Sequence, residues 1–124
     1  MPNKYPLMLF FLSALLFSCA VKNNDTLIIG NWQCVQWTAE GTDAGYDIAH
    51  TQFHFKQNEL YEAVITGRAE IGTWYREGSK LYTTAEGSAK IMTNIITSTQ
   101  DSLVLGMNRG GINEQMVLLR MQTE

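Results

Sequence analysis

The chain of 124 residues lacks a basic cluster, and its formal net charge at pH 7 is −3. A mildly acidic chain of this kind is not expected to bind nucleic acid or anionic headgroups. No serine or cysteine stands in a recognisable nucleophile motif, and no glycine-rich turn precedes a helix to cradle a phosphate. These absences count against an enzyme and leave binding or structural roles.

Histidine is scarce, and the acidic residues are poorly spaced for a metal ion. His50 and His54 are the only histidines. On one straight strand their backbones would lie about 13 Å apart, which is too far for both to bind one ion. Glu40, Asp43 and Asp47 offer oxygen ligands for calcium, but their spacing differs from that of an EF-hand loop. We therefore expect outward-facing histidines, a solvated acidic loop, and neither a metal nor another cofactor.

A long hydrophobic run is missing as well. The apolar stretch at residues 6–18 is too short for a membrane-spanning helix, which takes about 20 apolar residues. Lys4 stands before this stretch and a small residue ends it, a pattern typical of a secretory signal peptide. We interpret residues 1–18 as a segment that is removed from the mature protein.

The end of that segment, Leu16-Phe17-Ser18-Cys19, resembles the lipobox of bacterial lipoproteins. The resemblance implies a lipoprotein signal peptide at residues 1–18 and a Cys19 thiol that carries a diacylglycerol, with palmitate among the expected acyl groups. Two or more acyl chains anchor a protein stably, so residues 19–27 would form a lipidated tether. Because Ala20 is not acidic, the outer membrane is the expected location, on its periplasmic face or at the cell surface. The alternative is an ordinary signal peptide, with Cys19 an incidental thiol.

Alternation of apolar and polar residues dominates residues 28–124, which are long enough for one domain. If Cys19 carries lipid, Cys34 has no disulfide partner, and we expect it to be a small buried residue on a strand. Segments rich in aromatic and β-branched residues predict strands within 27–38, 50–57, 59–66, 70–77, 80–86, 89–99, 102–108 and 114–122. Eight short strands joined by tight turns predict an all-β fold, an antiparallel up-and-down barrel that leaves no open edge.

The same alternation assigns side chains to the two faces of the sheet. In the strand at residues 89–99 both faces are apolar, so its register stays open. The long connection at residues 39–49 is either a lid over one mouth of the barrel or a solvated loop. The inward-facing residues are expected to be Trp32, Cys34, Phe53, Phe55, Tyr61, Ala63, Ile65, Gly72, Trp74, Leu103, Leu105, Met116, Leu118 and Arg120, and the outward-facing ones Val35, Trp37, Tyr75 and Tyr82.

Gly30-Asn31-Trp32, at the head of the first strand, resembles the lipocalins and their calycin relatives. In that family the indole closes one end of the barrel and an arginine of the last strand lies across it, a place that Arg120 would take here. A guanidinium over an indole is a favourable cation–π pair. Residues 28–122 are also similar to the compact lipocalin-like domain of many Gram-negative lipoproteins, through "GNWQ", "FHF", "GTWYREGSKL" and "DSLVL" in that order. The resemblance implies a barrel-closing pair of Trp32 and Arg120.

An eight-stranded barrel is just wide enough to be filled by side chains or to hold one small ligand. We expect both uses, with a packed base and a shallow pocket beneath the long connection. The favoured hypothesis is a non-enzymatic, membrane-tethered lipoprotein that binds a small apolar or amphipathic ligand in the barrel mouth. Its candidate ligand-binding residues are Phe53, Phe55, Tyr61 and Trp74. The alternative is a structural or accessory lipoprotein that binds a protein partner through its outer face.

Overall fold

The structure is a computed structural model that describes residues 25–122 of the chain. The strands are β1 (Gly30–Ala39), β2 (Thr42–Asp43), β3 (Gln52–Phe55), β4 (Leu60–Ile65), β5 (Arg68–Glu77), β6 (Lys80–Ala85), β7 (Ile91–Ser98), β8 (Ser102–Arg109) and β9 (Ile112–Arg120), with one 3-10 helix, η1 (Ile48–His50). Each of the eight predicted strands is present, with bounds that differ by a few residues. Within residues 25–122 there is no helix long and apolar enough to cross a membrane.

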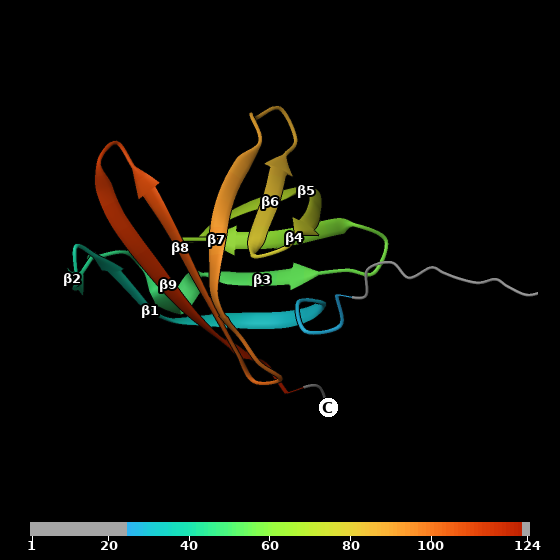
Figure 1. Ribbon diagram of the computed structural model, residues 1–124, viewed down its shortest axis with the longest axis horizontal. Coiled ribbons are helices and arrows are strands. Elements are labelled where there is room, and N and C mark those ends of the chain that lie inside the picture. The colour runs from blue at the N-terminus through green and yellow to red at the C-terminus, as the bar shows by residue number, and fades with distance from the viewer. Residues whose placement is uncertain (1–24, 123–124) are drawn as a thin grey trace, which may run out of the picture.

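The strands form a single antiparallel sheet that closes on itself (Figure 1). Each strand from β3 to β8 pairs with the next along the chain, and β1 pairs with both β3 and β9. The two-residue strand β2 is an extension that pairs with β1 alone. The predicted up-and-down barrel of eight strands is therefore confirmed, and β2 is the one strand that was not predicted.

A β-bulge in β1 changes which of its side chains face inward. The pairing with β9 steps from Cys34 opposite Leu118 to Gln36 opposite Val117, so β1 carries one extra residue. Val35 and Gln36 are both exposed as a result, and inward alternation resumes at Trp37, which is 8% exposed. The prediction that Trp37 faces outward was wrong, because strict alternation does not register a bulge.

The register of β7 is settled by its pairing with both neighbours, Thr93 opposite Leu81 on β6 and Ile95 opposite Leu105 on β8. A second irregularity in the pairing with β8 lies between Ile95 and Thr97. Thr93 is buried and Ile95 contacts the core, whereas Met92 and Ile96 are exposed. The inward residues predicted on the other strands are confirmed at the core positions Tyr61, Ala63, Trp74, Leu103, Leu105 and Leu118. Cys34 is buried as predicted, and burial raises the pKa of its thiol.

One end of the barrel is closed by Trp32, which is fully buried and donates from its indole nitrogen to the carbonyl of Ile28 at 2.8 Å. The guanidinium carbon of Arg120 lies 4.4 Å from the centre of the Trp32 ring. A side chain on Gly30 would overlap this guanidinium, and the φ of Gly30 is 139°. The Gly-x-Trp motif thus leaves room for Arg120 to reach across the indole.

Arg120 also ties the two ends of the described chain together at this closed end. Its guanidinium donates to the carbonyls of Ile29 at 2.8 Å and Leu27 at 3.2 Å, and to that of Gln100 at 2.6 Å. The carbonyl of Asp25 accepts bonds from two backbone amides just after it, at 2.9 Å each. Residues 25–27, the last of the predicted tether, therefore form a turn against the barrel. The signal peptide, Cys19 and the rest of the tether lie outside the described residues.

Candidate functional site

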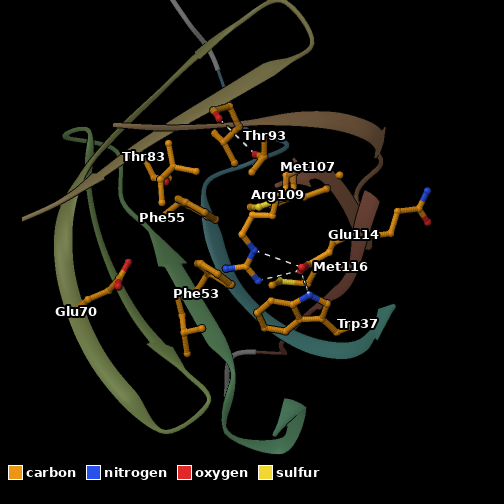
Figure 2. Close-up of a pocket in the computed structure, with 16 residues that line it drawn as sticks. Trp37, Phe53, Phe55, Glu70, Thr83, Thr93, Met107, Arg109, Glu114 and Met116 are labelled. Atoms are coloured by element: carbon orange, nitrogen blue, oxygen red, sulfur yellow. Dashed lines mark hydrogen bonds and ion pairs between the residues drawn. The ribbon is translucent and has the colours of Figure 1, made fainter. Parts of the chain in front are cut away.

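The opposite end of the barrel holds a cavity of about 160 Å³ (Figure 2). Its walls come from strands β1 and β3 to β9, so it lies in the lumen rather than on the outer face. A cavity of about 150 Å³ with apolar walls is large enough to bind benzene. The apolar and aromatic lining residues are Trp37, Phe53, Phe55, Ile65, Leu81, Ile91, Leu105, Met107 and Met116, and the polar side chains are Glu70, Thr83, Thr93, Arg109, Glu114 and Gln115.

Two of the four predicted ligand-binding aromatics line this cavity. Phe53 and Phe55 are two positions apart on β3, and their rings are nearly parallel, with centroids 5.7 Å apart. The structure places Tyr61 and Trp74 outside the lining. Their rings lie 6.0 Å and 5.4 Å from that of Phe55, and both residues form part of the core.

A buried carboxylate organises the wall of the cavity formed by β1, β8 and β9. Glu114 on β9 is 8% exposed, and it accepts a 2.9 Å hydrogen bond from the indole nitrogen of Trp37. Arg109 donates to both of its carboxylate oxygens, from Nη2 at 2.9 Å and from Nε at 3.3 Å. The bonds from Arg109, with a further one from Trp37, hold the pKa of the Glu114 carboxyl below its usual range despite burial. The wall therefore contains a carboxylate that is paired with Arg109, and both of its oxygens accept hydrogen bonds.

The long connection after β1 packs against two side chains of this wall. The ring of Tyr46 lies 4.4 Å from that of Trp37, and its hydroxyl accepts from Arg109 at 3.4 Å. The amide of Ala44 donates to the carbonyl of Trp37 at 2.9 Å, which holds the connection against β1. Parts of this connection form β2 and η1, and its Tyr46 contacts two residues that line the cavity.

Glu70 stands on the other side of the lumen, on β5 (Figure 2). Its carboxylate accepts a 2.7 Å hydrogen bond from the hydroxyl of Tyr61. Burial, together with the neighbouring Glu70, raises the pKa of the Tyr61 phenol, which therefore stays a donor. Within residues 25–122 no lysine, arginine or histidine nitrogen lies within 4.0 Å of the Glu70 carboxylate.

The histidines lie away from the cavity. His50 belongs to η1, where its ring nitrogen is 2.8 Å from Asp47, and His54 faces Glu62 at 3.9 Å. No group of three potential metal ligands was found among residues 25–122. Two of the acidic residues considered for calcium accept hydrogen bonds from backbone amides. The carboxylate of Asp43 accepts from the amide of Gly45 at 2.7 Å, and that of Glu40 accepts from the amide of Asn113 at 2.8 Å. Each carboxylate thus takes part in holding the connections at the open end.

A closed antiparallel barrel with one packed end and one end that opens on a small apolar cavity defines a class of up-and-down β-barrels that can enclose a ligand. The family profile described as "Lipocalin-like domain" matches residues 28–105, which run from just before β1 into β8. The chain belongs to this family of lipocalin-like domains.

Comparison with solved structures shows the same fold. The chain is similar to a lipocalin-like protein from Bacteroides uniformis ATCC 8492, whose crystal structure was solved at 1.79 Å resolution. The TM-score is 0.55 and the identity 14%, over 77% of this chain and 99% of that one. No curated protein matches this sequence.

Proposed function

We propose that this protein is a non-enzymatic binding protein that holds one small apolar or amphipathic molecule in the open end of its barrel. The observation that carries the proposal is the apolar cavity of about 160 Å³ lined by Phe53, Phe55 and Trp37. Its volume suits a compact molecule about the size of one ring, whereas a long acyl chain would not fit without rearrangement of the lining. Membership of the lipocalin-like family supports binding in general.

The expected affinity follows from the area that such a ligand loses to water. A ring-sized molecule that buries about 200 Å² of apolar surface gains about 5 kcal/mol. This corresponds to a dissociation constant on the order of 0.1 to 1 mM before any polar contact is counted. Specific polar contacts at Glu70 or Arg109 would therefore decide which ligand is held tightly.

Native mass spectrometry of residues 20–124, purified from a bacterial periplasm, tests the proposal directly. Residues 25–122 contain every strand of the closed barrel, so this piece retains the whole cavity. Extra mass in the native spectrum that is lost on denaturation would support binding and begin to identify the ligand. A bare protein mass, together with no saturable binding of any ring-sized probe, would contradict it.

The proposal includes a lipid tether at Cys19 that holds the protein at the outer membrane. The lipobox resemblance of residues 16–19 supports it. Labelling of cells with an alkyne analogue of palmitate is expected to mark the wild-type protein and to leave the Cys19→Ala variant unmarked. Equal labelling of both proteins would contradict lipid attachment at Cys19.

A second candidate function, contact with a protein partner, is favoured by one feature of the outer face. Tyr75 and Tyr82 stack on neighbouring strands with ring centroids 4.7 Å apart, and the Lys90 nitrogen lies 5.2 and 5.3 Å from the two rings. Tyr75 is 38% exposed, so this cluster offers an aromatic and cationic surface. Loss of a co-purifying protein on Tyr75→Ala, but not on Arg68→Ala, would support this role, and identical pull-downs would count against it.

A further inference from the structure

The cavity contains an unbalanced negative charge. Three charged side chains line it, Glu70, Arg109 and Glu114. Arg109 and Glu114 neutralise each other through two hydrogen bonds of 3.3 and 2.9 Å. Glu70 has no such partner among residues 25–122, so the lining carries one carboxylate whose charge is not compensated.

The position of Glu70 makes this charge available to a ligand. In the order of the sheet, β5 and β9 lie on opposite sides of the closed barrel, which separates Glu70 from the Arg109 and Glu114 pair. Glu70 shares the inward face of β5 with the buried Trp74. One of its oxygens accepts the Tyr61 hydroxyl at 2.7 Å, whereas within residues 25–122 no donor contacts the other oxygen. That oxygen can accept from a donor in the lumen.

The walls beside Glu70 favour a positive rather than a negative ligand. The rings of Phe53, Phe55 and Trp37 line the lumen. An aromatic ring attracts a cation within about 6 Å of its centre, and the attraction grows when the cation is removed from water. An anionic ligand would instead face the carboxylates of Glu70 and Glu114, with the guanidinium of Arg109 already bonded to the latter.

We propose that the ligand held in this cavity is a small organic cation, an amine with a compact apolar body about the size of one ring. Its ammonium group donates to the free oxygen of Glu70, and its apolar body lies against Phe53 and Phe55. This inference rests on the proposed binding function and specifies the chemical class of the ligand. Tyr61 acts as a positioning residue, because its hydroxyl holds one oxygen of Glu70 and leaves the other for the ligand.

Three probes with the same ring and a similar length separate charge from shape: 2-phenylethylamine, 2-phenylethanol and 3-phenylpropionate. Their dissociation constants with residues 20–124 are measured at pH 7 by isothermal titration calorimetry. We expect the amine to bind about tenfold more tightly than the alcohol, since a hydrogen bond between charged groups is stronger than a neutral one. The carboxylate is expected to bind more weakly than the alcohol, and added salt should reduce the preference for the amine.

Two variants test whether the charge of Glu70 causes the preference for the amine. Glu70→Gln keeps the size of the side chain and an acceptor for Tyr61 but removes the charge, so it should bring the amine to the affinity of the alcohol while the alcohol binds as before. Glu62→Gln is the matched control, because Glu62 is an exposed carboxylate of the neighbouring strand that pairs with Lys56 at 2.7 Å outside the cavity. It should leave the preference for the amine unchanged.

The outcomes distinguish this inference from the proposed function. Binding of all three probes with similar affinity, or a preference for the amine that persists in Glu70→Gln, would overturn the inference and leave the cavity as a site for apolar molecules. Failure of all three probes to bind would overturn the proposed function and this inference with it. Loss of the preference for the amine in Glu70→Gln, but not in Glu62→Gln, would support both the proposed function and this inference.

Discussion

Replacement of Arg120 by alanine is expected to lower the free energy of unfolding by about 3 kcal/mol. The contact of its guanidinium with the Trp32 ring, at 4.4 Å, is worth about 0.5 to 2 kcal/mol. The part-buried hydrogen bond to the Ile29 carbonyl adds about 1 kcal/mol. The more exposed bonds to Leu27 and Gln100 together add about 1 kcal/mol more.

This loss is a large fraction of the stability of a small domain, which is about 5 to 15 kcal/mol. Urea unfolding of residues 20–124 at pH 7, followed by tryptophan fluorescence, measures it. With a denaturant slope of about 1.5 kcal/mol per molar, the midpoint should fall by about 2 M. Arg120→Lys keeps the charge but not the planar fork of donors, and should fall between wild type and alanine.

Arg68→Ala is the matched control for this experiment. Arg68 is an exposed arginine at the start of β5, and it makes no salt bridge or side-chain hydrogen bond within residues 25–122. Its loss should shift the midpoint little, since exposed substitutions usually change stability by about 0.5 kcal/mol or less. If Arg120→Ala shifts the midpoint no more than Arg68→Ala does, the closed end of the barrel is not held by this arginine.

Three further predictions concern single positions. Gly30→Ala should destabilise the barrel, because the φ of 139° and the overlap with the guanidinium of Arg120 both oppose a side chain there, and wild-type stability in urea would refute this. The folded-state pKa of Glu114 lies below its ordinary value of 4.5, so its contribution to stability is present above about pH 4.5 and is lost as pH falls through the lower folded-state value. Unfolding of Glu114→Gln should therefore depend less on pH between about 5 and 2 than that of wild type, and equal slopes would contradict the assignment. Cys34 is 2% exposed and burial raises the pKa of its thiol, so a disulfide reagent should modify it only at the rate at which the barrel opens, and rapid modification in native buffer would refute its burial.

The barrel itself was predictable because its information is local. Alternation in each segment identified the strands and most of the inward side chains, and turn residues marked the hairpins. The bulge at Val35 was not predictable in this way, because an extra residue in one strand is recognised only when its partner strand is known. The burial of Trp37, and with it one wall of the cavity, follows from that bulge.

The carboxylates of the site follow the alternation of their strands. Glu70 lies two and four residues before Gly72 and Trp74, and Glu114 lies two and four residues before Met116 and Leu118, so extension of the same alternation places both carboxylates inside. The existence of the cavity could not be predicted in the same manner. Whether inward side chains fill a barrel depends on the sum of their volumes and on the rotamers they adopt. The alternation of apolar and polar residues predicts neither of these.

The turn at Asp25 determines at which end of the barrel the N-terminal residues join the domain. It lies at the end of the barrel that Trp32 and Arg120 close, far from the mouth (Figure 1). If Cys19 carries the lipid, residues 19–24 connect it to this turn over at most about 20 Å. The closed end would then be the end held within that distance of the bilayer, with the mouth at the far end of the barrel. A molecule so oriented would draw its ligand from solution rather than out of the lipid layer to which it is attached.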